Sequence, residues 1–292
     1  MKDITAQFHQ DLKLKTVKTG DKIDVGGDVI SFVEARMLHW PDSMFSYLEK
    51  ENVLFTNDVF GMHYATSKLF DDENEERMWL YEAEKYYANI VLPYSDIVLR
   101  FLDQVKKLGL APRIIAPDHG FVWRKDPSKI INLYAKWAAQ APKNKAVIVY
   151  DTMWGSTEKM AVQIADALRE GGTEVKQLSM HACHRSDIAT EMLDASALIV
   201  GSPVLNSGIF PSLADVLCYL KGLRKKGLVG ATFGSYGWSP APIDELGKML
   251  ETMGVKVVAP AVKSLFVPDE TVLKNCRELG LTVSKEIAKK LQ

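Results

Sequence analysis

Residues 152–157, with the sequence Thr-Met-Trp-Gly-Ser-Thr, combine one glycine with three hydroxyl side chains. They follow an apolar run at 146–149 and precede apolar residues at helical spacing from Met160 to Leu168. Such a turn between a strand and a helix is an anion site, because backbone N–H groups, hydroxyls and the positive end of the helix dipole face the ligand. The turn has no Arg, and Lys159 falls inside the helix, so we expect it to hold the phosphate of a resident cofactor.

The alternatives for this turn differ in their glycine pattern. A nucleotide triphosphate loop needs Gly-x-x-x-x-Gly-Lys-Ser/Thr and a dinucleotide loop needs Gly-x-Gly-x-x-Gly, and the turn has neither. The pattern Thr-x-x-Gly-Ser-Thr after a first strand resembles the phosphate loop of flavodoxins, which hold FMN. The remaining alternative is an ordinary helix start with Ser156 or Thr157 as N-cap.

Two later strands end in loops of similar character. Apolar runs at 197–200 and 230–234 lead into the loops 201–208 and 235–239. The carboxyl ends of parallel strands are where open α/β sheets bind ligands, and the last loop offers a tyrosine and a tryptophan that can stack on a flat ring. The alternative is ordinary turn residues and surface aromatics. The predicted FMN-binding residues are Thr152, Met153, Trp154, Gly155, Ser156, Thr157, Ser202, Pro203, Val204, Leu205, Asn206, Ser207, Gly208, Ser235, Tyr236, Gly237, Trp238 and Ser239.

Three strand ends in the first half of the chain each present a residue that can bind a metal: His39, Asp58 and His119. A rigid scaffold builds a metal site by bringing such residues together from separate strands. Imidazole and carboxylate without thiol suit zinc, iron or manganese. Taken singly, each residue also fits a plainer role: a hydrogen-bonded histidine, or an aspartate that forms a turn.

The combination resembles the metallo-β-lactamase-like domain of flavodiiron proteins, also called A-type flavoproteins. The motifs Leu-His-Trp-Pro-Asp-Ser at 38–43, Phe-Thr-Asn-Asp-Val-Phe-Gly at 55–61 and Pro-Asp-His-Gly at 117–120 are similar to three ligand motifs of that family. The spacings of 19 residues between the first His and the Asp, and of 61 to the second His, agree as well. In that family an FMN domain follows directly, so the resemblance covers nearly the whole chain.

The resemblance implies a function and roles for individual residues. In the family, FMN passes electrons from a reductant to a non-haem diiron centre, which reduces O2 to water or NO to N2O. It implies that His39 ligates one iron, His119 the other, and that Asp58 bridges them. Tyr86 stands at the position of a tyrosine near the diatomic substrate in the family, although a core role beside Tyr87 is the simpler interpretation.

One family motif, His-x-Glu-x-Asp-His, is absent from the sequence, and residues 1–38 contain only His9 as a histidine. We therefore expect the front of the metallo-β-lactamase-like domain to be missing, and this chain alone to bind FMN without a working diiron pair. Two further hypotheses remain. One is an FMN-only electron carrier with an inactive metal half. The other is a dinuclear zinc hydrolase, against which the FMN domain argues.

Elements that must position these residues follow from the apolar pattern. From 146 onward, apolar strands alternate with helical segments up to a helix at 269–290, which predicts a doubly wound parallel sheet. The polar, proline-containing segment 141–145 marks a boundary. The predicted fold is α/β: a partial metallo-β-lactamase-like αββα domain over residues 1–141, followed by a flavodoxin-like FMN-binding domain over residues 145–292.

The first domain has a different pattern. Alternating residues at 12–17, a turn and residues 23–25 predict a hairpin. Strands are predicted at 29–35, 53–56 and 113–116, and a final helix at 127–140. A helical stretch from 73 to 108 is expected to break near Pro93, because proline removes a helix hydrogen bond.

Composition limits the partners. The 292 residues carry 36 basic and 37 acidic side chains, a net charge of −1, so neither nucleic acid nor a membrane surface is indicated. No apolar run reaches membrane-spanning length, and the N-terminus lacks the apolar core of a signal peptide. The three cysteines are isolated, which suits the cytoplasm, and without a Cys-x-x-Cys pair no rubredoxin module is fused.

The electron donor is therefore expected to be a separate molecule, such as rubredoxin or a reduced deazaflavin. The family resemblance also implies a head-to-tail homodimer or homotetramer, in which the FMN of one subunit lies beside the metal centre of the other.

Overall fold

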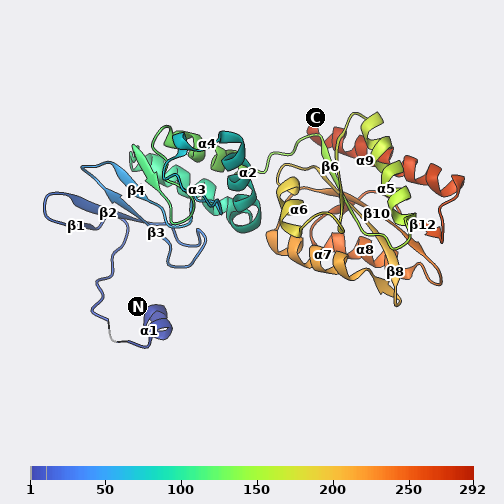
Figure 1. Cartoon of the computed structure of the whole chain (residues 1–292), viewed down its shortest axis with the longest axis horizontal. Helices are drawn as coiled ribbons and strands as arrows, with labels where there is room; N and C mark the ends of the chain where they lie inside the picture. The colour runs from blue at the N-terminus through green and yellow to red at the C-terminus, as the bar shows by residue number, and fades with distance from the viewer. Residues whose placement is uncertain (1, 11) are drawn as a thin grey trace. The chain divides into compact units, whose positions relative to one another are not determined.

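The computed structural model describes residues 2–10 and 12–292 (Figure 1). The chain divides into two compact units by its internal contacts. The first contains the residues up to Ala83 together with Asp96–Tyr134, and the second contains Glu84–Ser95 together with Ala135–Gln292. A short helical segment of the first half of the sequence is thus packed with the second unit.

The second unit is built on a parallel sheet with the strand order β7-β6-β8-β10-β11. The first strand in sequence, β6, has β7 and β8 as its neighbours, so the chain reverses its direction of travel across the sheet there, as in flavodoxin-like folds. Every residue of β6 is buried, because helices cover both faces. The strands are β6 Lys145–Tyr150, β7 Glu174–Ser179, β8 Ala197–Leu205, β10 Val229–Tyr236 and β11 Lys256–Val257, with β12 Val262–Leu265 paired to β10 and β9 Gly208–Ile209 to β8.

Helices cover the two faces of this sheet in separate groups, with α5 and α9 on one side and α6, α7 and α8 on the other (Figure 1). The first face is filled by apolar side chains such as Ile148 and Ile199 from the sheet, Ile164 from α5 and Val283 from α9. The helices are α5 Ser156–Glu170, α6 Arg185–Met192, α7 Pro211–Leu223, α8 Ala241–Thr252 and α9 Glu270–Leu291.

The first unit contains a five-stranded sheet in the order β1-β2-β3-β4-β5. Its pairs are antiparallel except for β4 and β5, which are parallel, so those two strands end at the same edge. Phe45 from the sheet packs edge-on against Phe101, with ring centroids 4.6 Å apart. The elements are α1 Lys2–Phe8, β1 Lys22–Asp24, β2 Val29–Glu34, β3 Met44–Leu48, β4 Val53–Phe55, a 3₁₀ turn Asp71–Glu73, α2 Glu76–Tyr86, α3 Ser95–Lys107, β5 Ile114–Ala116 and α4 Pro127–Ala138.

The predicted break in the long helical stretch is confirmed. After α2 the chain passes through a π-helical turn, Tyr87–Val91, and a 3₁₀ turn, Leu92–Tyr94, before α3 begins. Pro93 lies in the 3₁₀ turn, where its missing N–H costs least. Across the described residues, every helix is too short or too polar to serve as a membrane span.

The prediction of a strand at 12–17 is wrong, since these residues form no regular element. Leu12 and Leu14 are 40% and 38% exposed, so the alternation has no buried face to match. The hairpin is instead formed by β1 and β2 around Gly26 and Gly27, both at positive φ. The strands β3, β9 and β12 were not predicted, because each owes its extension to a neighbouring strand.

Close packing of α9 on α5 depends on Gly280. A Cβ at this position would lie 2.6 Å from the Ile164 carbonyl and 2.8 Å from the Ala167 Cβ. We expect Gly280→Ala to lower the free energy of unfolding by about 1–3 kcal/mol, because two helix backbones must move apart. Gly222→Ala in α7, where nothing lies within 4 Å, should instead stabilise by about 0.5–1 kcal/mol through helix propensity. Urea denaturation measures both, and equal effects would contradict this account of the contact.

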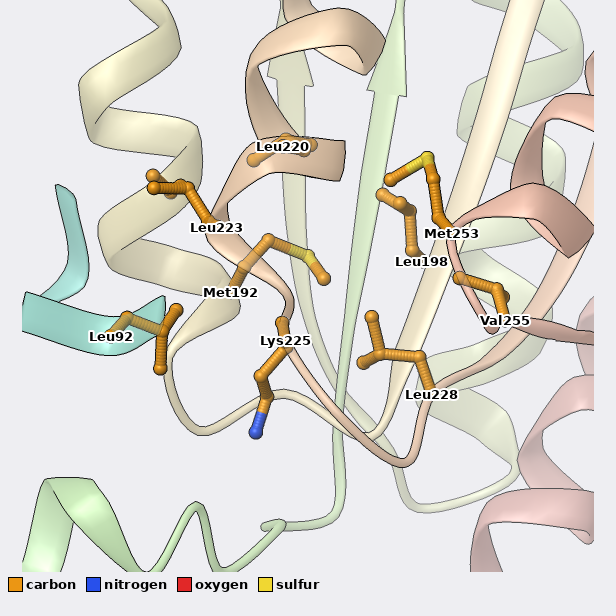
Figure 2. Close-up of a pocket in the computed structure, with 10 residues that line it drawn as sticks. Leu92, Met192, Leu198, Leu220, Leu223, Lys225, Leu228, Met253 and Val255 are labelled. Carbon is orange, nitrogen blue, oxygen red and sulfur yellow. The ribbon is translucent and has the colours of Figure 1, made fainter. Parts of the chain in front are cut away.

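A buried lysine lies at the opposite edge of the sheet from the strand carboxyl ends. Lys225 is 9% exposed and lines a small apolar cavity with Leu198, Leu228 and Met253 (Figure 2). Its amine is directed away from the leucines and donates to the Gln140 carbonyl at 3.4 Å. Burial, aided by the charge of Lys290, lowers the pKa of Lys225 to about 8.

This burial predicts a pH-dependent stability. Between pH 8 and the ordinary lysine value near 10.4, the unfolded chain binds more protons at this position than the folded chain, so stability rises with pH there. We expect Lys225→Met to stabilise the protein at pH 7 by about 1–3 kcal/mol, with the gain shrinking as the pH approaches 10. The check is denaturation of wild type and variant at several pH values. Lys221→Met, on the exposed face of α7, should show no such trend.

Candidate flavin site and metal-ligand cluster

The turn between β6 and α5 has the conformation that its glycine permits. Gly155 has φ +83° and stands at the N-cap of α5, and its N–H donates to the Thr152 hydroxyl at 3.0 Å. Open space surrounds the position that a Cβ would take at Gly155. The first N–H groups of a helix lack acceptors within the helix, so a ligand above this turn meets unsatisfied donors.

Asp151, the residue directly before the turn, fixes the position of the turn's first residue. It is 2% exposed, and its Oδ1 accepts the Thr152 N–H at 2.7 Å. The Ser212 hydroxyl on α7 donates to Oδ2, and the His181 Nε2 lies 2.9 Å from Oδ1. Two of these three contacts are to Oδ1 and one is to Oδ2, so both oxygens of the buried carboxylate have a partner and the carboxylate holds the backbone at the strand end.

The ends of β8 and β10 are tied closely to this turn. The buried hydroxyls of Thr157 and Ser235 lie 3.0 Å apart and share a hydrogen bond. A Cβ at Gly234 would lie 2.1 Å from the Ser202 carbonyl, so only glycine lets β8 and β10 approach here. The three predicted loops therefore meet at one edge of the sheet.

A hollow of about 320 Å³ opens where these loops meet. Flat side chains stand at its rim: Trp154 is 90% exposed, Trp238 97% and Phe266 64%. This volume is at the lower end of the range for small-molecule sites, and the aromatic rim suits a planar ring. Its lining is Met153, Trp154, Ser156, Pro203, Val204, Ser235, Tyr236, Gly237, Trp238, Phe266 and Val267.

Phe266 and Val267 were not predicted. They follow β12, which was itself not predicted, and the Phe266 N–H donates to the Tyr236 carbonyl at 2.9 Å. In the sequence, the signal was no more than a phenylalanine directly after Leu265, since its exposure is visible only in the structure. Several predicted residues lie outside the lining. Thr152, Gly155 and Thr157 make hydrogen bonds that hold the turn, and the Ser202 hydroxyl donates to the Pro203 carbonyl within its own loop. Leu205–Gly208 form the hairpin of β8 and β9, and Ser239 is exposed.

The lining contains no charged side chain. An anion bound there must therefore be held by N–H groups, hydroxyls and the dipole of α5, rather than by an ion pair. This arrangement fits the phosphate of a resident cofactor, and a planar ring can rest against the aromatic rim.

The three candidate metal ligands come together in the first unit. The Asp58 Oδ1 lies 3.0 Å from the His119 Nε2, and its Oδ2 lies 3.4 Å from the His39 Nε2. Asp58 and His119 follow β4 and β5, the parallel pair whose ends share an edge. Asn57 fixes this edge, since its carbonyl accepts the Asp118 N–H at 2.8 Å and its side-chain oxygen accepts the Met44 N–H at 3.1 Å.

Each carboxylate oxygen of Asp58 contacts a different imidazole, so one carboxylate is shared by the two histidines. Within the described residues, no group of three or more His, Cys, Asp or Glu side chains is arranged to hold a single metal ion. The cluster thus consists of one carboxylate and two imidazoles, and donors of these types are ones that iron, zinc and manganese accept. His63, which was not predicted, packs at right angles to His119 with ring centroids 5.4 Å apart.

Tyr86 lies at the end of α2, 2% exposed, and the adjacent Tyr87 is fully buried. Tyr86 falls in the segment Glu84–Ser95 that packs with the second unit. Its burial is that of a core aromatic.

Comparison with known proteins matches each half of the chain to a protein family. Residues 5–120 match the family model "ODP family beta lactamase" and residues 148–280 match "Flavodoxin". The chain is 45% identical over 281 residues to a nitric oxide reductase of Moorella thermoacetica, covering 96% of this chain and 70% of that protein.

Solved structures agree with this assignment. The rubredoxin oxygen:oxidoreductase of Desulfovibrio gigas superposes with a TM-score of 0.96 at 40% identity, covering 99% of this chain and 73% of that one. The flavodiiron protein of Giardia intestinalis superposes with a TM-score of 0.88 at 29% identity, covering 94% and 68%. With a metallo-β-lactamase-like half followed by a flavodoxin-like half, the chain belongs to the flavodiiron protein family.

Proposed function

We propose that the chain is a flavodiiron oxidoreductase that passes electrons from a donor through FMN to a non-haem diiron centre, which reduces O2 to water or NO to N2O. The observation that carries this proposal is one carboxylate, Asp58, placed between two imidazoles in a chain whose other half has an uncharged hollow at its strand ends. The functional boundaries proposed are residues 1–141 for the metal-binding half and 145–292 for the FMN-binding half.

The flavin half would hold its cofactor by neutral groups. The first N–H groups of α5 and the Ser156 hydroxyl, which lines the hollow, are proposed to bind the phosphate, since no charged side chain lines the hollow. Thr152 and Thr157 are proposed to belong to the same site by holding the turn through their hydroxyl hydrogen bonds. Trp154 and Trp238 are proposed to flank the ring. When bound, FMN supplies the capacity to accept electrons from a donor and release them singly or in pairs.

The metal half would contribute one imidazole to each iron. His39 and His119 are proposed as the separate ligands, and Asp58 as the bridge that holds two cations together and offsets part of their charge. Tyr86 is proposed to lie near the diatomic substrate on the basis of the family alone. The irons, when bound, would supply the site at which O2 or NO is reduced.

A second candidate is an FMN-only electron-transfer protein. The observation in its favour is that the cluster offers just two protein donors to each metal position, and that the described residues form no larger group. Such a protein would carry FMN while its metal half stayed inactive.

The donor is proposed to be a separate protein or a reduced deazaflavin. Rubredoxin fits the name of the Desulfovibrio gigas relative. A head-to-tail homodimer or homotetramer is proposed from the family. A cytoplasmic location is proposed because Cys183, Cys218 and Cys276 are all free thiols.

Asp58→Ala tests the metal assignment. After anaerobic loading with Fe(II), we expect this variant to retain at least tenfold less iron and O2- or NO-reducing activity than wild type, with the FMN content unchanged, because both proposed metal positions lose their shared ligand. The matched control is Asp118→Ala, since the Asp118 carboxylate accepts a hydrogen bond from the Asn57 side-chain amide at 3.2 Å. Iron is measured by elemental analysis and FMN by its visible absorption.

The wild-type result separates the two candidates. Two irons per chain with substrate consumption support the reductase and contradict the expectation from the absent His-x-Glu-x-Asp-His motif. One FMN per chain with neither iron nor turnover supports the electron carrier. A colourless protein that takes up no added flavin would contradict both.

Trp238→Ala tests the flavin assignment. Trp238 is 97% exposed, so its removal should leave the sheet folded. Loss of one aromatic contact, about 0.5–1.5 kcal/mol, predicts an FMN affinity about two- to tenfold weaker. Fluorescence titration of the apoprotein measures this, with Tyr81→Ala in α2 as the control for loss of an exposed aromatic. Unchanged FMN affinity would show that the loop after β10 does not contact the ring.

A further inference from the structure

The loop that follows β7 reaches the phosphate turn from a neighbouring strand. Its course is fixed by the Met180 N–H, which donates to the Tyr150 carbonyl at 2.9 Å, and by the Ala182 N–H, which donates to the Ser179 carbonyl at 3.0 Å. This brings the His181 ring to the first residues of the turn, although its side chain is 64% exposed. The loop was not among the predicted ligand-binding segments.

The His181 ring makes two contacts through one nitrogen. Its Nε2 lies 2.9 Å from the Asp151 Oδ1 and 3.1 Å from the Thr152 carbonyl oxygen. An ionised carboxylate and a carbonyl are both acceptors only, so the nitrogen between them must carry the hydrogen. One N–H therefore serves both atoms, and the tautomer follows from its surroundings.

These contacts hold both backbone groups of Thr152. Its N–H donates to Asp151 at 2.7 Å, and its carbonyl accepts from His181. The Thr152 hydroxyl in turn accepts the Gly155 N–H, so the position of Thr152 also determines the position of Gly155. A group that fixes Thr152 thus fixes the donors that face a phosphate.

The same contact answers an electrostatic problem. Asp151 is 2% exposed and stands directly before a turn that is to bind an anion, while the hollow beyond it has no cationic side chain. A buried carboxylate so close to a phosphate would repel it. The His181 N–H, 2.9 Å from the Asp151 Oδ1, offsets part of that charge.

We propose that His181 is a positioning residue for the FMN phosphate: it locks the first residue of the phosphate turn and compensates the charge of Asp151. This rests on the proposed binding of FMN. The role concerns the phosphate alone, because the residues that line the hollow come from β8 and from the ends and loops of β6, β10 and β12, and none comes from the loop after β7.

Riboflavin, which has the same ring without the phosphate, separates this role from a general structural one. We expect His181→Ala to weaken FMN binding to the apoprotein about tenfold, as befits a hydrogen bond to a charged group, and to leave riboflavin binding within about twofold. His181→Gln, which can return an N–H donor, should recover most of the FMN affinity. Fluorescence quenching of each flavin measures the dissociation constants.

His184→Ala is the control. This histidine stands three residues further on, caps α6 through Ser186 and has no contact with the turn, so both affinities should stay unchanged. Equal weakening of FMN and riboflavin in His181→Ala, or unchanged FMN binding, would overturn the inference while the FMN proposal stands. If the wild-type protein binds neither flavin, the proposed function itself fails.

Discussion

A phosphate that is bound without a cationic side chain needs hydrogen-bond donors that the fold has already placed, and this requirement constrains the second unit. With no charged side chain in the hollow, the affinity for a phosphate must come from backbone N–H groups, hydroxyls and one helix dipole. Such donors bind well only if folding has already aimed them. The buried Asp151 before the turn, the positive φ of Gly155 and the hydroxyl pair of Thr157 and Ser235 all fix the backbone of the turn. The strand order places them together, because β6, β8 and β10 are parallel neighbours and end at one edge.

The carboxyl edge of this sheet is open to a ligand, whereas the amino edge is closed by apolar side chains. At the carboxyl edge, the loops leave backbone groups and a hollow for a ligand. At the amino edge, leucines and methionines from the flanking helices close over the strand starts, and the one amine among them, Lys225, has its pKa lowered by burial. Apolar side chains cannot donate hydrogen bonds to an anion, so the amino edge could not bind a phosphate. Because the strands are parallel, all their carboxyl ends lie at the other edge, and the ligand loops gather there.

The sequence predicts the parts of this arrangement that depend on local pattern. Buried strands are visible as apolar runs and the phosphate turn as a glycine among hydroxyls. The apolar runs at 146–149, 197–200 and 230–234 lie within β6, β8 and β10, and the helix predicted at 269–290 agrees with α9 to within one residue at each end. Contacts that depend on which strands pair could not be predicted from the sequence. Phe266 reaches the hollow because β12 pairs with β10, and His181 reaches the turn because β7 lies beside β6. The alternating segment 12–17 shows the converse error, since alternation without a partner strand makes no sheet.

In the first unit, the side chains of the predicted cluster were harder to foresee than their positions. Spacing along the chain could place His39, Asp58 and His119 at strand ends, but not the way one carboxylate divides its oxygens between two imidazoles. Part of this division follows from strand pairing. Asp58 and His119 follow β4 and β5, which are parallel and end at one edge, so their side chains meet there. The His39 ring comes from a separate loop and reaches the other carboxylate oxygen, a contact that depends on side-chain conformation rather than on spacing along the chain.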